Sequence, residues 1–142
     1  MSLSHWALLG FVVWTLLLVV VGVGVPRISA VLARRARANS FNPAVAHGSE
    51  RYQRTMRAHL NCLENLPVFA ALVLLGTQLA VPGALFQIAA LVVLPARVLQ
   101  STVHIASGRN RAVLARFTFF SIQIGCFALL IALLVAHGLR TG

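Results

Sequence analysis

The sequence predicts an all-α integral membrane protein built as a bundle of four transmembrane helices. Of its 142 residues, 59% are hydrophobic and only 10% are charged, whereas soluble domains carry about 25% charged residues. The apolar residues form four long runs separated by short polar or arginine-rich segments. A transmembrane helix needs about 20 mainly apolar residues to cross the hydrocarbon core. We therefore expect a single membrane domain over residues 1–142, with helices at about 3–38, 51–80, 84–107 and 112–138.

The first predicted span, Leu3–Val25, holds no charged residue and is long enough to cross the bilayer. A cleaved signal peptide is the alternative. However, no basic segment precedes the run, and the run exceeds the roughly 7 to 15 apolar residues of a signal peptide. An arginine-rich loop follows and reaches Arg54. This loop either anchors the helix on the cytoplasmic side or acts as a lid that contributes one arginine to a site.

The second predicted helix begins with a polar stretch. Its apolar run, Leu66–Val81, covers only sixteen residues, so its first turns must be polar if it is to span the membrane. At about 100° per residue, the strongly polar side chains of this stretch fall in one stripe: Arg54, Arg57, Asn61, Glu64 and Asn65. His59 lies nearly opposite that stripe. Pro67 lacks the N–H that would donate to the carbonyl of Leu63, which predicts a kink.

The third and fourth predicted helices each carry a further polar stripe. The third helix follows a tight turn at residues 81–84 and is too short to span the membrane on its apolar residues alone. It must therefore continue through a polar face made of Arg97, Gln100, Ser101 and His104. On the fourth helix, Arg116 shares a face with Phe120 and Gln123 near the same end.

Nearly all of the arginines lie in or next to the first and third loops. Because cytoplasmic loops of membrane proteins are enriched in Lys and Arg, both loops are expected to be cytoplasmic and both termini non-cytoplasmic. All three polar stripes would then lie in the cytoplasmic half of the bilayer. The expected location is a bacterial inner membrane, with membrane lipids as neighbours.

The three stripes carry more positive than negative charge. An arginine at the centre of a transmembrane helix costs about 2.5 to 3.5 kcal/mol on insertion scales, so these arginines need partners or water. Glu64 is the only acidic residue expected inside the membrane, and it cannot neutralise four of them: Arg54, Arg57, Arg97 and Arg116. The surplus predicts a pocket for an anion whose carboxylates bind arginine. Alternatively, the arginines reach lipid headgroups, and Asn, Gln and Ser side chains only link helices.

Other kinds of site receive little support from the sequence. The histidines form no HExxH or HxxxH pattern and the chain holds no Asp, which argues against a metal site or a pair of catalytic carboxylates. Cys62 and Cys126 lie in apolar segments, and we interpret them as buried, inert thiols. All of the basic residues are Arg and lie in short segments between apolar runs, so no nucleic-acid partner is expected.

The string R-x-x-R-A-H-x-N-x-x-E-N-x-P, present as Arg54–Pro67, resembles the second-helix signature of the MAPEG family, the membrane-associated proteins of eicosanoid and glutathione metabolism. The likeness extends over the whole chain. The long basic first loop, the short second loop, an Arg-Val pair on helix three and an arginine that opens helix four lie where that family has them. The resemblance implies a homotrimer with three glutathione sites between neighbouring subunits, open to the cytoplasmic half of the membrane.

The family motif also implies roles for individual residues, with glutathione as the co-substrate. Arg57, Asn61 and Glu64 would hold the peptide, and Arg116 would be the catalytic residue that stabilises the thiolate. Further contacts to glutathione would come from Arg34, Arg97, Gln100 and His104, whereas His59 and Pro67 would be structural. The chain departs from many glutathione-using members at Leu60, His104 and Phe117, where those members often have Arg, Tyr and Ser.

These observations predict a glutathione-dependent transferase or peroxidase that acts on a lipophilic electrophile from the bilayer, with Arg116 lowering the pKa of the glutathione thiol. The alternative is a non-catalytic membrane protein that binds an anionic lipid headgroup or a partner protein through its arginine stripes. Anion transport is a weaker third hypothesis, because the polar positions stop halfway across the membrane.

Overall fold

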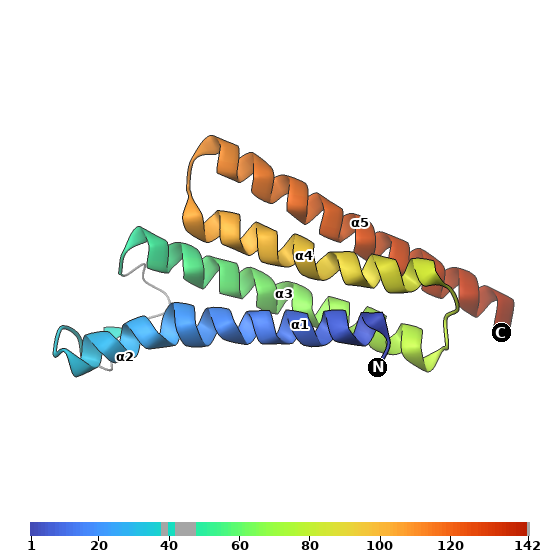
Figure 1. Cartoon of the computed structure of the whole chain (residues 1–142), viewed down its shortest axis with the longest axis horizontal. Coiled ribbons are helices and arrows are strands. Elements are labelled where there is room, and N and C mark those ends of the chain that lie inside the picture. Colours follow the sequence, from blue (N-terminus) through green and yellow to red (C-terminus); the bar gives the residue numbers. More distant parts are fainter. Residues whose placement is uncertain (38–39, 42–47, 142) are drawn as a thin grey trace.

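The chain folds into four long helical rods that run side by side (Figure 1). The computed structural model describes residues 1–37, 40–41 and 48–141. The first rod combines α1 (Leu3–Leu17), a π-helical segment η1 (Leu18–Gly24) and α2 (Val25–Leu32). The other three rods are α3 (Glu50–Gln78), α4 (Ala84–Ala106) and α5 (Asn110–Thr141). All four rods are long and apolar enough to cross a membrane, which confirms the predicted all-α, four-helix membrane fold.

The first rod ends before residue 38, the end expected from the sequence. After Leu32 the helix gives way to a turn in which Arg34 adopts a left-handed backbone with a φ of 54°. The backbone N–H groups of Arg35 and Ala36 both donate to the carbonyl of Ala30, at 2.9 and 3.3 Å. These bonds satisfy the carbonyls at the helix end and stop the helix there. Position 38 itself lies outside the described residues.

The remaining helices begin and end close to the expected positions. Ser49 caps the N-terminus of α3, because its Oγ accepts a hydrogen bond from the backbone N–H of Tyr52 at 3.2 Å. Glu50 follows in the first turn, where a negative charge interacts favourably with the helix dipole. α3 remains helical through Pro67.

α4 packs most extensively in the bundle, against α1, α3 and α5. Three buried rings hold the rods together in the core. Phe11 and Phe69 have ring centroids 5.6 Å apart, and Phe69 stacks on Phe127 at 6.0 Å. Aromatic pairs at these distances stabilise a core beyond the area they bury. The contacts fix the rotation of α1, α3 and α5 relative to one another.

Both termini lie at one end of the bundle, together with the turn between α3 and α4 (Figure 1). The connection that leads into α3 and the turn between α4 and α5 lie at the other end. Hence the described arginines that follow α2 lie at the same end of the bundle as the turn between α4 and α5. This end is called the arginine-rich end below.

A close contact between α3 and α4 leads to a prediction about stability. A Cβ added to Gly76 would lie 2.0 Å from the ring atom Cζ of Phe86, and Phe86 is only 1% exposed, so its ring has little free space into which to move. Gly76→Ala is expected to destabilise the fold by about 1 to 3 kcal/mol through overpacking. The measurement is the melting temperature of the purified protein in detergent. Gly125→Ala is the control, because no heavy atom lies within 4 Å of the Cβ added there; equal melting temperatures of the two variants would contradict this contact.

Candidate functional site

A narrow polar notch lies between α3 and α4 in the arginine-rich half of the bundle. Its lining side chains are Ala58, Asn61, Arg97, Gln100, Ser101 and His104. The notch leaves no volume that a water-sized molecule could occupy, whereas small-molecule pockets measure about 300 to 1,000 Å³. One chain therefore supplies a wall of polar groups but not a complete pocket.

The polar residues of α3 divide between two directions. Asn61 lines the notch, whereas Arg57 and Glu64 are exposed on the outer surface of α3. Arg57 and Glu64 are two helical turns apart on one line along the helix, and Asn61 lies about 40° away from that line. Of the three, only Asn61 therefore lines the notch. A rotation of α3 that buries Ala58 and Cys62 against α4 leaves the charged pair outside.

Arg97 occupies the core of the bundle rather than its surface. Its side chain is 1% exposed, and its guanidinium carbon lies 5.6 Å from the centroid of the Phe11 ring. Nε and Nη2 of Arg97 have no hydrogen-bond partner within the part of the chain that the structure describes. Because unpaired N–H groups of a buried guanidinium are costly, these two nitrogens of Arg97 have unused capacity to bind an anionic group that reaches the notch.

A short contact joins α4 to α5 at the arginine-rich end. Nη1 of Arg116 lies 2.6 Å from Nδ1 of His104. Arginine is always protonated and can only donate, so His104 Nδ1 accepts and the proton of the neutral imidazole resides on Nε2. Both side chains are half-buried. Arg54 and Arg57 of α3 also act electrostatically on His104, in addition to Arg116 of α5.

Sequence reasoning placed Ser101 on the polar face of α4 but left Ala58 and Cys62 out of the site. Ser101 Oγ donates to the carbonyl of Arg97 at 2.8 Å and lies 3.7 Å from the sulfur of Cys62. Cys62 is 0% exposed, which agrees with its interpretation as a buried thiol. Small side chains on facing positions of α3 and α4 were the available signal, since they allow two helices in a membrane to approach closely.

Four other predicted residues lie away from the notch. Arg54 has a structural role, because its Nε donates to the carbonyl of Ile105 at 3.2 Å and its Nη1 pairs with Glu50 at 3.2 Å. Arg34 is exposed in the turn after α2 and lines a different surface pocket. His59 is half-buried on α3, and Pro67 lies within the continuous helix, which is compatible with the structural roles expected for both.

Asn61, Gln100 and His104 thus converge with buried Arg97, while Arg116 contacts His104 from α5. This arrangement can bind a small molecule that carries carboxylates, provided that further surface closes the notch. A comparison with protein families found that residues 7–136 match the model of the MAPEG family, all but six residues at each end. No curated protein matches the chain. The family is generally associated with glutathione. With a four-helix membrane bundle and a family match over nearly its full length, the chain belongs to the MAPEG family.

Proposed function

We propose that this protein is a membrane-embedded glutathione-dependent transferase or peroxidase that acts on lipophilic electrophiles. The observation that carries the proposal is the contact between Arg116 and His104 beside the notch lined by Asn61 and Arg97. Glutathione has two carboxylates, one ammonium group and one thiol. A site with several guanidinium groups and a single nearby carboxylate, Glu64, matches that set of charges.

Unpaired polar atoms around the notch support the fit. Among the described residues, the buried atoms without a hydrogen-bond partner include Nε and Nη2 of Arg97, Oε1 of Gln100 and Nε of Arg116. Three of these atoms are donors suited to carboxylates or to a thiolate, and the fourth is an acceptor suited to an amide N–H. Buried polar groups are normally hydrogen-bonded, so this set favours a polar ligand over an empty site.

We further propose that the site is completed between copies of the chain in a homotrimer. Arg57 and Glu64 are exposed on a surface that would otherwise face hydrocarbon, where ionised side chains cost several kcal/mol. A second copy over this surface would remove that cost and would deepen the notch into a pocket. If the protein in mild detergent binds glutathione but has the mass of a monomer, this assembly is wrong.

The residues then take distinct roles in binding. Arg57 and Arg97 hold carboxylates, Glu64 pairs with the ammonium group, and Asn61 and Gln100 bond to the peptide amides. Arg34, from the turn after α2, supplies a further contact to a carboxylate. When glutathione is bound, its thiolate supplies the nucleophile for a lipophilic electrophile that enters from the bilayer.

Arg116 and His104 set the electrostatics of the reacting end. His104 accepts from Arg116 and thereby holds the guanidinium in one orientation, so that its remaining N–H groups point consistently toward a ligand. A fixed cation favours the thiolate over the thiol. In this proposal, Arg116 is the catalytic residue and His104 its positioning residue.

The expected orientation in the membrane follows from the arginines. Both arginine-rich loops lie at one end of the bundle, and arginine-rich loops remain on the cytoplasmic side. The proposed site therefore opens to the cytoplasm from a bacterial inner membrane, and both termini lie on the other side.

A second candidate function is that of a non-catalytic protein that binds an anionic lipid headgroup or a partner protein. The observation that favours it is the exposure of Arg57 and of Phe117, which is 65% exposed beside Arg116 where many glutathione-using members have Ser. An exposed guanidinium binds a phosphate as readily as a carboxylate. Glutathione binding distinguishes the two functions.

Glutathione binding to the detergent-purified protein is the direct test, by isothermal titration calorimetry. Arg57→Ala and Glu64→Gln are each expected to weaken binding about 10- to 100-fold, since a hydrogen bond to a charged group contributes about 1.5 to 3 kcal/mol. Arg140→Ala is the matched control, because Arg140 is exposed near the end of α5. If the wild-type protein binds anionic lipid but not glutathione, the second candidate function is correct and the enzymatic function is wrong.

A further inference from the structure

A groove separates the first rod from α3 near the arginine-rich end of the bundle. Its volume is about 570 Å³, within the range of about 300 to 1,000 Å³ that small-molecule pockets occupy. Trp14, Leu17 and Val21 of the first rod form one wall, and Tyr52 and Thr55 of α3 form the other. The groove shares none of its lining residues with the polar notch between α3 and α4, so it is a separate site.

The backbone of the π-helical segment closes the floor of this groove. Gly22 lies so near α3 that an added Cβ would come 2.3 Å from Cγ2 of Thr55. Gly22 and Thr55 both line the groove, so its floor is formed by close helix contact rather than by a large side chain. π-helical turns are rare, and they frequently occur at functional sites. The π-helical segment and the close approach of Gly22 to Thr55 therefore shape this groove.

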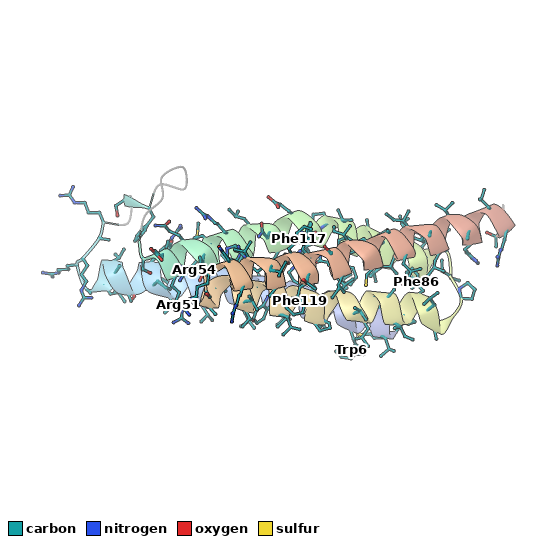
Figure 2. All side chains as sticks on the ribbon, turned by 90° about the horizontal axis from the view of Figure 1, so that it is seen from above. Trp6, Arg51, Arg54, Phe86, Phe117 and Phe119 are labelled. Atoms are coloured by element: carbon teal, nitrogen blue, oxygen red, sulfur yellow. The ribbon has the colours of Figure 1, made fainter. Side chains whose placement is uncertain are left out.

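One guanidinium group lines the groove and a second lines the cavity next to it. Arg51 lines it directly and, as labelled in Figure 2, lies beside Arg54 at the start of α3. Arg27 lines a second cavity of about 370 Å³ that adjoins the groove through Pro26, Ser49 and Tyr52, which line both. Nε of Arg27 donates to the Tyr52 hydroxyl at 2.6 Å.

The local acid does not cancel this positive charge. Glu50 is the acidic residue next to Arg51 in the chain, and its carboxylate pairs with Arg54 at 3.2 Å. Arg51 is exposed and makes no side-chain hydrogen bond or ion pair with another described residue. The groove thus has apolar walls on two candidate membrane spans and a cationic mouth, formed by Arg51, at the arginine-rich end of the bundle.

From this combination we infer that the groove binds an anionic glycerophospholipid of the surrounding leaflet. One acyl chain would lie along Trp14, Leu17 and Val21, and the phosphate would bind Arg51 and Arg27. Apolar walls alone would accept any lipid tail, whereas basic residues at the membrane surface select anionic headgroups. Charge complementarity at the mouth is therefore what identifies the occupant. The inference does not depend on the proposed enzymatic function.

Trp14 provides a probe inside the groove. The chain holds two tryptophans, and Trp6→Phe leaves Trp14 as the only one; Trp6 is 56% exposed on α1, away from the groove. The Trp6→Phe protein is placed in phosphatidylcholine vesicles that contain either phosphatidylglycerol or phosphatidylcholine with brominated acyl chains at equal mole fraction. Bromine quenches tryptophan fluorescence at short range. Brominated phosphatidylglycerol is expected to quench Trp14 at a lower mole fraction than brominated phosphatidylcholine does.

Two pairs of variants separate specific binding from general contact with lipid. Arg51→Gln should reduce the preference for the anionic lipid about five-fold, as expected for one basic residue near a membrane surface, whereas Arg111→Gln, at another exposed arginine of the same end, should not. Val21→Phe fills the groove and should abolish the preference. Val20→Phe is its control, because both valines are 58% exposed but only Val21 lines the groove.

Three outcomes would overturn the inference. Equal quenching by the two brominated lipids would mean that the groove takes acyl chains without selecting a headgroup. No quenching by either lipid would mean that another copy of the chain covers the groove. A preference for phosphatidylglycerol that survives Arg51→Gln combined with Arg27→Gln would place the anionic site elsewhere.

Discussion

Arg116→Leu is expected to abolish the ultraviolet absorbance of bound glutathione thiolate near neutral pH and to lower transferase activity about 100- to 1,000-fold. A cation about 4 Å from a thiolate attracts it by roughly 4 kcal/mol at an effective dielectric near 20. An attraction of that size would lower the pKa of a thiol from about 8.5 to about 6. Solvent at the mouth of the site reduces the effect. The measurement is difference absorbance on addition of glutathione, together with turnover of a model lipophilic electrophile.

Two further variants make the result for Arg116 specific. Arg111→Leu removes an exposed arginine from the same helix and should leave the thiolate signal unchanged. His104→Phe removes the acceptor that lies 2.6 Å from Arg116, so it should weaken the thiolate signal while glutathione still binds through Arg57 and Glu64. Wild-type protein that binds glutathione without any thiolate signal would be a binding protein rather than a transferase. Phe117→Ser would then test whether the thiolate signal is missing because Phe117 stands where many glutathione-using members have Ser.

Arg97→Met is expected to have opposite effects on stability and on ligand binding. Arg97 is 1% exposed and two of its nitrogens have no partner among the described residues. Replacing a buried ionic group by an apolar side chain of similar volume is often neutral or stabilising by about 1 to 4 kcal/mol. The melting temperature of the ligand-free protein should therefore stay the same or rise, while glutathione binding falls about 10-fold or more because a donor to a carboxylate is lost.

The control for Arg97→Met is the neighbouring Leu99→Met, a volume-conserving change at a side chain that is 46% exposed and is expected to alter neither property. Strong destabilisation by Arg97→Met would show instead that this guanidinium is paired in the assembled protein. Glu64, which interacts electrostatically with Arg97, is then the first partner to test, with the double variant Arg97→Met and Glu64→Gln.

Much of the site was predictable as a set of residues but not as an arrangement. Spacing placed Arg97, Gln100, Ser101 and His104 on one face of α4, and Gln100, Ser101 and His104 do line the notch together with Arg97. The same reasoning grouped Arg57, Asn61 and Glu64, yet α3 turns only Asn61 toward α4. Periodicity gives the width of a stripe to within about one residue, and a stripe about 100° wide can be divided between a helix contact and an open surface.

By itself, the sequence determined that this protein crosses the membrane four times and that its arginines gather at one end, because hydropathy and charge are sums over local segments. Only the tertiary structure decided that Arg97 is buried against Phe11, that His104 accepts from Arg116, and that Arg57 and Glu64 lie outside. These outcomes depend on the rotation and register of each helix. Rotation and register are both set by contacts between different helices, such as Gly76 against Phe86 and Phe69 between Phe11 and Phe127. The period of one helix carries no information about such contacts.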